Sequence, residues 1–252
     1  GGPGCHRLGE GEIPLKTMLI KPCKAVCGTI ELPGDKSISH RAAILSSLAK
    51  GRTEIRGFLF SDDCLVTLSA LKAMGVDVKT FTREHRVIID SCGVLCPPRY
   101  PLDMKESGTS ARMLMGLLAG QGFVSRLTGA PSILRRPMAR VIKPLSLMGA
   151  EIQARQRGGR DYLPVLIRPS VLHGICWKQD VASAQVKSAL LLAGLFAQGD
   201  TCVHEAVTTR DHTERMLRFF GADLRVSGGD IVVKRSDLVS PGLVNIPGDI
   251  SS

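Results

Sequence analysis

Three short segments combine small polar residues with lysine or arginine in a spacing that suits anion binding. They are residues 34–41, 106–112 and 182–187, and each stands where a helix is expected to begin. Small hydroxyl residues and glycine favour helix N-termini, where unpaired backbone N–H groups and the positive end of the helix dipole attract anions. One such segment indicates only a helix cap. Three equivalent ones, each followed by a basic residue at helical spacing, predict one shared anion site.

The elements that position these segments form a threefold repeat. Gly75, Gly149 and Gly221 lie 74 and 72 residues apart, each followed by a small apolar residue and an acidic one. Upstream of each of these glycines, a helical apolar pattern ends in alanine and glycine, at residues 48–51, 118–120 and 196–199, as expected at a helix C-terminus. A strand-like run follows each repeated glycine, at residues 87–89, 165–167 and 231–233. The sequence therefore predicts an α/β fold built from three similar strand-helix-strand-helix-strand-strand units, roughly residues 28–98, 99–172 and 173–246.

The composition and charge pattern of the chain argue against a membrane-spanning protein and against a nucleic-acid-binding protein. The 252 residues are 44% hydrophobic and 4% aromatic, with 33 Lys+Arg against 23 Asp+Glu and a net charge of +10. The longest apolar run, residues 189–197, is far shorter than the ~20 residues of a transmembrane helix, and the first residues lack the features of a targeting peptide. We expect a cytoplasmic protein that binds small anions and neither membrane nor nucleic acid, because basic residues here lack the aromatic neighbours of a single-strand binding groove.

Eight cysteines raise the question of disulfides or metal. Cys23/Cys27 and Cys92/Cys96 share a C-x-x-x-C spacing, which does not match the common zinc-binding patterns. The histidines are dispersed and form no metal-binding helix motif. We therefore expect free thiols and no metal.

Three motifs are specific enough to indicate a family. Residues 32–41, 127–138 and 182–190 closely resemble segments of 5-enolpyruvylshikimate-3-phosphate synthases, in the same order and at similar distances. The resemblance extends from about residue 24 to the end of the chain. It implies that family's inside-out α/β domain, made of three repeats.

The resemblance also implies a division of the chain. Family members have two such domains with the active site between them, and residues 247–252 look like the start of the second domain. We expect an extension without counterpart over residues 1–17, an N-terminal domain over residues 18–246 and a missing C-terminal half. The full-length protein is expected to be a monomer.

The implied reaction is transfer of the enolpyruvyl group of phosphoenolpyruvate to the 5-hydroxyl of shikimate 3-phosphate, with release of phosphate and without a cofactor. Two crowded anions demand many cationic and N–H donors. By resemblance, the shikimate 3-phosphate ligands are Lys36, Ser37, Arg41, Ser183, Ala184 and Gln185. The phosphoenolpyruvate ligands are Lys36, Gly108, Arg136 and Gln185, with Lys36 between the substrates as the catalytic residue.

One departure from the family pattern falls at Glu106. The family commonly has Gly-Asn-Ser/Ala-Gly-Thr where this chain has a carboxylate two residues before Gly108. A carboxylate near a phosphate is repulsive unless Lys105 or Arg112 neutralises it. Substrate affinity and the response to glyphosate, which competes with phosphoenolpyruvate in this family, therefore depend on this position.

Two alternatives remain open at this point. The sister enolpyruvyl transferase acting on UDP-N-acetylglucosamine shares the fold, but it is expected to carry Lys-Asn in place of Lys36 and Ser37 and a reactive cysteine in the loop before the Arg-Pro pair. Here that loop, residues 129–135, contains no cysteine. The second alternative is a non-catalytic half that binds a phosphorylated metabolite, because the acid and base groups of the other domain are absent.

Overall fold

The computed structural model describes residue 25 and residues 27–251. Contacts divide the chain into Gly1–Glu31 and a compact unit of Leu32–Ser252, and the compact unit contains every helix and strand found in the described residues. Within the described residues, no helix is both long and apolar enough to span a membrane. The expected extension over residues 1–17 lies outside the described residues, so the domain division stays a prediction.

The helices and strands follow the predicted repeat in the second and third units, and in the first unit from its first helix onward. The first unit contains α1 (Lys36–Leu48), β1 (Ala49–Arg56), α2 (Asp62–Ala73), β2 (Asp77–Phe81), the 3-10 turn η1 (Thr82–Glu84) and β3 (Arg86–Cys92). The second contains β4 (Leu102–Asp103), α3 (Gly108–Ala119), β5 (Ser125–Thr128), η2 (Ile133–Arg135), α4 (Ala139–Leu147), β6 (Glu151–Arg157) and β7 (Arg160–Arg168). The third contains β8 (Cys176–Lys178), α5 (Ala184–Gly194), β9 (Thr201–His204), α6 (His212–Phe219), β10 (Leu224–Ser227) and β11 (Asp230–Val233), followed by β12 (Leu238–Val239) and β13 (Leu243–Asn245).

Three sheets share one topology. In the second and third, the order is β4-β5-β7-β6 and β8-β9-β11-β10, with a parallel pair first and antiparallel pairs after it. The first sheet differs from the predicted order, because no strand precedes α1 within the described residues. β12 and β13 instead pair in parallel with β1, so the end of the third unit supplies the opening strand of the first. The last strands of the third unit thereby complete the sheet of the first unit.

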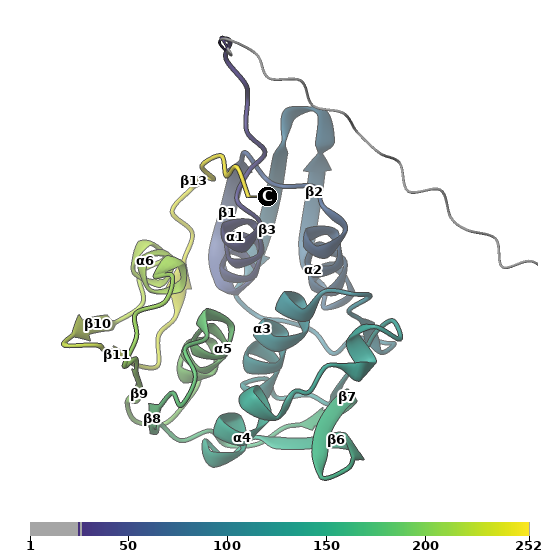
Figure 1. Ribbon diagram of the computed structural model, residues 1–252, viewed down its shortest axis with the longest axis vertical. Helices are drawn as coiled ribbons and strands as arrows, with labels where there is room; N and C mark the ends of the chain where they lie inside the picture. The colour runs from purple at the N-terminus through teal and green to yellow at the C-terminus, as the bar shows by residue number, and fades with distance from the viewer. Residues whose placement is uncertain (1–24, 26, 252) are drawn as a thin grey trace, which may run out of the picture. The chain divides into compact units, whose positions relative to one another are not determined.

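Helices lie inside and sheets outside. Figure 1 shows α1, α3 and α5 in the middle of the compact unit, with the three sheets around them. Ten of the twelve residues of α3 are buried, and α1 and α5 are buried along most of their lengths. A helix that is apolar on nearly every face belongs in a core, whereas α4 and α6 each keep an exposed polar face. The inside-out arrangement expected from the family resemblance is confirmed.

The repeated glycines end α2, α4 and α6 in the same way. Gly75, Gly149 and Gly221 have φ of 85°, 97° and 85°, a left-handed conformation that glycine adopts without a steric cost. The N–H of the residue after each glycine donates to the carbonyl five residues earlier, at 3.2, 3.0 and 2.9 Å. This is the Schellman arrangement, which pairs carbonyls that a helix end otherwise leaves open.

Two copies of the tripeptide Pro-Gly-Asp meet where the chain enters and leaves this unit. The N–H of Asp35 donates to the carbonyl of Pro247 at 2.9 Å, and the N–H of Asp249 donates to the carbonyl of Pro33 at 2.8 Å. An antiparallel bridge joins Gly34 and Gly248 between them. The two identical tripeptides are therefore paired reciprocally in space.

Helices α3 and α5 pack closely at Gly116 of α3. A Cβ placed on Gly116 would lie 2.1 Å from the carbonyl oxygen of Ala189 in α5, far inside van der Waals contact. The backbones of Gly116 and Ala189 both lie in the middle of buried helices, so neither has room to move aside.

We predict that Gly116→Ala lowers the free energy of unfolding by at least about 1–3 kcal/mol, because overpacking outweighs the better helix propensity of alanine. Gly122→Ala is the matched control: nothing lies within 4 Å of its added Cβ, and its stability should change by no more than about 0.5 kcal/mol. Urea unfolding followed by circular dichroism measures both. Equal stability of the two variants would contradict the close packing of α3 on α5.

Candidate anion-binding site at the helix N-termini

The three central helices begin with equivalent caps. Side-chain oxygens of Asp35, Ser107 and Ser183 accept hydrogen bonds from the backbone N–H three residues later, at 2.7, 3.2 and 3.4 Å. The predicted caps are confirmed, although a carboxylate caps the first helix. Ser37 instead occupies the second position of α1.

Arg41 is a deeply buried basic residue of the predicted site. Only 3% of it is exposed, and its guanidinium donates to Ser37 O at 2.9 Å, Ser188 Oγ at 2.7 Å and Thr213 Oγ1 at 2.6 Å. Burial lowers the pKa of Arg41 to about 10, and Glu214 opposes this shift, so the group stays charged at neutral pH. Arg41 therefore ties the first turn of α1 to Ser188 of α5 and to the start of α6.

Gln185 links the starts of α3 and α5. Its Oε1 accepts from Arg112 Nη1 at 2.8 Å, and its Nε2 donates to Thr109 Oγ1 at 2.9 Å. Arg112 Nη1 also donates to the carbonyl of Gly108 at 3.2 Å. The amide of Gln185 is thus held in one orientation by partners 73 and 76 residues away in the sequence.

Gly108 lies among guanidinium groups. A Cβ at this position would come within 2.9 Å of Arg112 Nη1 and 3.3 Å of Arg136 Nη1. Burial, then Arg136, then Arg140 lower the pKa of Arg112. Within the described part of the chain, none of these three arginines forms an ion pair with a carboxylate. Three neighbouring cations that pair with no carboxylate of the described residues make this region attractive to anions.

Lys36 lies between the starts of α1 and α3. Its Nζ is 3.0 Å from Asp63 Oδ2 in α2, and the backbone carbonyl of Asp63 accepts from Ser110 Oγ in α3 at 3.2 Å. About half of the Lys36 side chain is exposed. Lys36 lines an open surface hollow together with Asp63, Lys105 and Glu106.

Lys187, the basic residue of the third predicted segment, does not contribute a free cation to this site. Its ammonium is almost completely buried, at 2.8 Å from Glu205 Oε2 and 2.6 Å from Glu214 Oε1. The expectation that each cap is followed by a basic residue of a shared anion site is wrong for Lys187. Two carboxylates neutralise it, as a buried charge requires.

The structure brings in Arg210, which the sequence analysis missed. Arg210 Nη1 lies 3.4 Å from Ser37 Oγ, across 173 residues of sequence. Thr213, the partner of Arg41, follows in the same segment. The only signal in the sequence was a basic and hydroxyl-rich run, residues 208–213, just before α6.

Glu106 is hydrogen-bonded to a hydroxyl rather than paired with a cation. Ser132 Oγ donates to Glu106 Oε1 at 3.0 Å, while Lys105 Nζ pairs with Asp103 at 2.7 Å and Arg112 bonds Gln185. Neither of the two neutralising residues expected from the sequence pairs with Glu106. The carboxylate is exposed and leans toward the loop that precedes Arg136.

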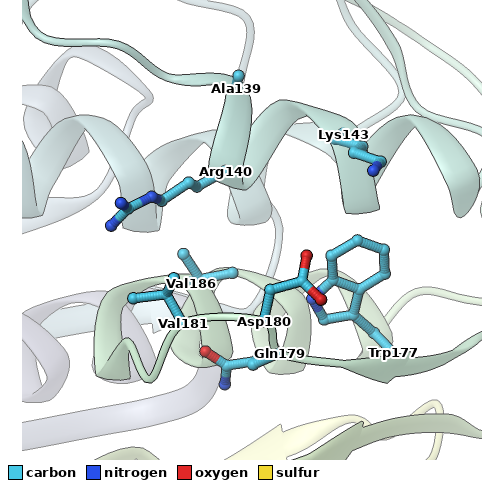
Figure 2. A pocket seen from close by; sticks show the side chains of 8 residues that line it. All are labelled: Ala139, Arg140, Lys143, Trp177, Gln179, Asp180, Val181 and Val186. Atoms are coloured by element: carbon cyan, nitrogen blue, oxygen red, sulfur yellow. The ribbon is translucent and has the colours of Figure 1, made fainter.

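A cavity adjoins the first turn of α5. Figure 2 shows Arg140 and Lys143 of α4 on one side and Trp177, Asp180, Val181 and Val186 on the other. Lys143 Nζ lies 5.9 Å from the centroid of the Trp177 ring. Gln179 accepts from the N–H of Ser183 at 3.1 Å, so this wall also supports the α5 cap. None of the residues predicted for the site lines the cavity.

The six cysteines among the described residues are free thiols, as the sequence predicts. Cys27, Cys64, Cys92, Cys96, Cys176 and Cys202 are free thiols, whereas Cys5 and Cys23 lie outside the described residues. Among the residues that the structure covers, no three histidine, cysteine or acidic side chains gather as metal ligands.

Comparison with known proteins places this arrangement in a family. Residues 20–252 match the family model for EPSP synthase, 3-phosphoshikimate 1-carboxyvinyltransferase. The chain belongs to the EPSP synthase family. It is 50% identical over 236 residues to 3-phosphoshikimate 1-carboxyvinyltransferase of Alkalilimnicola ehrlichii and 50% identical over 228 residues to that of Methylococcus capsulatus, covering 92% and 89% of this chain.

Solved structures agree. Two structures of EPSP synthase from Acinetobacter baumannii match with TM-scores of 0.84 and 0.85 at 45% identity, each over 89% of this chain. The match covers 51% and 50% of those chains, and 52% and 51% of the two curated relatives. The chain spans about half the length of the EPSP synthases it matches. The comparisons do not favour the UDP-N-acetylglucosamine alternative.

A line of hydroxyl groups connects α1, α2 and α3 beneath this site. His40 Nδ1 lies 2.7 Å from Thr67 Oγ1, which lies 2.8 Å from Ser110 Oγ, itself 2.7 Å from Ser107 Oγ. Burial is the main cause that lowers the pKa of His40 from 6.5 to about 4. His40 is therefore neutral in the folded protein at neutral pH.

We predict that stability falls as the pH drops from about 6.5 toward 4, because in that range the unfolded chain binds a proton at His40 that the folded chain excludes. His40→Asn, whose amide can still reach Thr67, should lose this part of the pH dependence. Urea unfolding of both proteins at pH 7 and pH 5 measures the difference. An identical change between the two pH values in parent and variant would contradict the assignment.

Proposed function

We propose that this chain forms the shikimate 3-phosphate-binding half of an EPSP synthase, which transfers the enolpyruvyl group of phosphoenolpyruvate to the 5-hydroxyl of shikimate 3-phosphate and releases phosphate. The observation that carries the proposal is the convergence of three capped helix starts with arginines that pair with no carboxylate of the described residues, in a chain of this family. Both substrates carry a phosphate and a carboxylate, the groups such a site attracts.

We assign shikimate 3-phosphate to the side formed by α1, α5 and α6. Arg41 uses three of its five N–H donors within the protein, which leaves two for the ligand. Ser37, beside Arg210, offers a hydroxyl, and the first turn of α5 offers Ser183, the backbone N–H of Ala184 and the amide of Gln185. The bonds of Arg41 to Ser188 and Thr213 hold its guanidinium in place before the ligand arrives.

Phosphoenolpyruvate belongs in this proposal on the α3 side. Gly108 leaves space beside its backbone N–H, and Arg136 with Arg112 supplies positive charge around that space. Gln185 touches both sides, because Arg112 and Thr109 hold its amide while its backbone lies in the α5 turn. Phosphate released in the reaction would form within the same group of cations.

Lys36 is the proposed catalytic residue. It lies between the two sides, since Asp63 connects it to the start of α3, and its ammonium is partly exposed toward the hollow. A charge in that position stabilises negative charge shared between two substrates. The other half of the enzyme is proposed to supply the remaining acid and base groups, and the working protein to be a cytoplasmic monomer without metal or cofactor.

Calorimetric titration of this chain with shikimate 3-phosphate tests the proposal, with UDP-N-acetylglucosamine and inorganic phosphate as competing ligands. Selective, saturable binding of shikimate 3-phosphate is expected, because its proposed ligands all lie within residues 36–210. Tighter binding of UDP-N-acetylglucosamine would overturn the substrate assignment. A folded chain, checked by circular dichroism, that binds none of the three would overturn the proposal that this half carries the pocket.

We predict that Lys36→Met weakens shikimate 3-phosphate binding by roughly 1.5–3 kcal/mol, or about 10- to 150-fold in Kd, the usual value of a hydrogen bond to a charged group. Lys79→Met is the matched control: Lys79 also pairs with an aspartate, Asp77, at 3.4 Å, but lies on β2 away from the helix starts. The control should bind like the parent. Unchanged affinity in Lys36→Met would remove Lys36 from the site.

A further inference from the structure

Two cysteines face each other across the parallel strands β8 and β9. Cys176 and Cys202 are direct register partners, and the N–H of Cys202 donates to the carbonyl of Ile175 at 2.7 Å. Neighbouring strands lie about 4.7–4.9 Å apart, which is within the range of Cα separations, about 4.4–6.8 Å, that a disulfide spans. The strand register therefore gives the two residues a backbone separation that a disulfide can span.

Both thiols lie on the outer face of this sheet. Cys176 is exposed and Cys202 partly exposed, while the alternate residue Val203 is completely buried and Trp177 turns toward the cavity of Figure 2. Burial, followed by the hydrogen bond with the Cys176 thiol, raises the pKa of Cys202 to about 12. The more accessible Cys176 is therefore the thiol that an external reagent meets first.

We propose that Cys176 and Cys202 form a dithiol site that a low-molecular-weight disulfide, such as glutathione disulfide, converts to an intramolecular disulfide. The Cys176 thiolate attacks one sulfur of the reagent and expels a thiolate, which leaves a mixed disulfide. Cys202 then loses its proton and attacks the Cys176 sulfur, and the second reagent thiol leaves. Two protein thiols are oxidised and one small disulfide is reduced to two thiols, so atoms and electrons balance.

The position of this bond gives it a structural effect. The loop that it closes, residues 176–202, contains the whole of α5 and therefore Ser183, Ala184 and Gln185 at the start of that helix. A crosslink across this loop restricts the unfolded chain and ties β8, which leads into the α5 cap, to β9. The proposal rests on strand register and exposure and does not depend on which substrate the protein binds.

Mass spectrometry of the intact chain after incubation with glutathione disulfide tests the proposal. We expect a product about 2 Da lighter than the parent. A peptide pair joining Cys176 to Cys202 should appear in a non-reducing digest and disappear with dithiothreitol. Cys176→Ser should yield no such crosslink, and Cys202→Ser should stop at a glutathione adduct on Cys176. Cys92→Ser, which removes an exposed cysteine on β3, is the control and should form the crosslink like the parent.

Two further readouts separate this bond from unspecific oxidation. The crosslinked chain should melt about 5–10 °C higher than the reduced one, with no such rise in either serine variant of the pair. Trp177, the single tryptophan of the chain, stands next to Cys176 and should change its fluorescence reversibly as the disulfide forms. A stable glutathione adduct on Cys176 in the parent protein, or crosslinks of Cys176 to other cysteines in its place, would overturn the proposal.

Discussion

The buried guanidinium of Arg41 is the interaction on which the arrangement of the helix starts depends. A charge removed from water must find hydrogen-bond partners nearby, and Arg41 finds them in three elements: the first turn of α1, Ser188 of α5 and Thr213 of α6. Glu214, next to Thr213, adds the negative charge that favours its charged form. Through this one side chain, the start of α6, near Arg210, is joined to α1 and α5.

The buried charges around it form a balanced group. Lys187 is neutralised by Glu205 and Glu214, so the interior between α5 and α6 holds two basic and two acidic side chains including Arg41. The arginines at the start of α3 have no such compensation among the described residues. This difference separates the charges that hold the fold together from those that can attract a ligand.

A symmetric scaffold carries an asymmetric site. The first residue after each helix cap is Lys36, Gly108 or Ala184, and the second is Ser37, Thr109 or Gln185. The three repeats thus place equivalent backbone N–H groups around one region, while their side chains differ in charge, size and hydrogen-bonding capacity. In the proposed function, this divergence allows one face to accommodate two different anions. The first repeat contributes the cation of Lys36, the second the space beside Gly108, and the third the amide of Gln185.

The sequence by itself determined the features that depend on neighbouring residues. The repeat marked by Gly75, Gly149 and Gly221, the caps before α1, α3 and α5, and the strands at residues 87–89, 165–167 and 231–233 could be predicted, because caps and strand patterns are set within a few residues. That these three glycines end α2, α4 and α6 was learned from the structure. The tertiary structure alone decided which distant residues meet. It placed β12 and β13 beside β1, brought Arg210 to Ser37, neutralised Lys187 and bonded Glu106 to Ser132. Such contacts join residues up to about 190 positions apart, and they arise from the demand to pair buried charges and backbone groups over the whole unit, which no local pattern encodes.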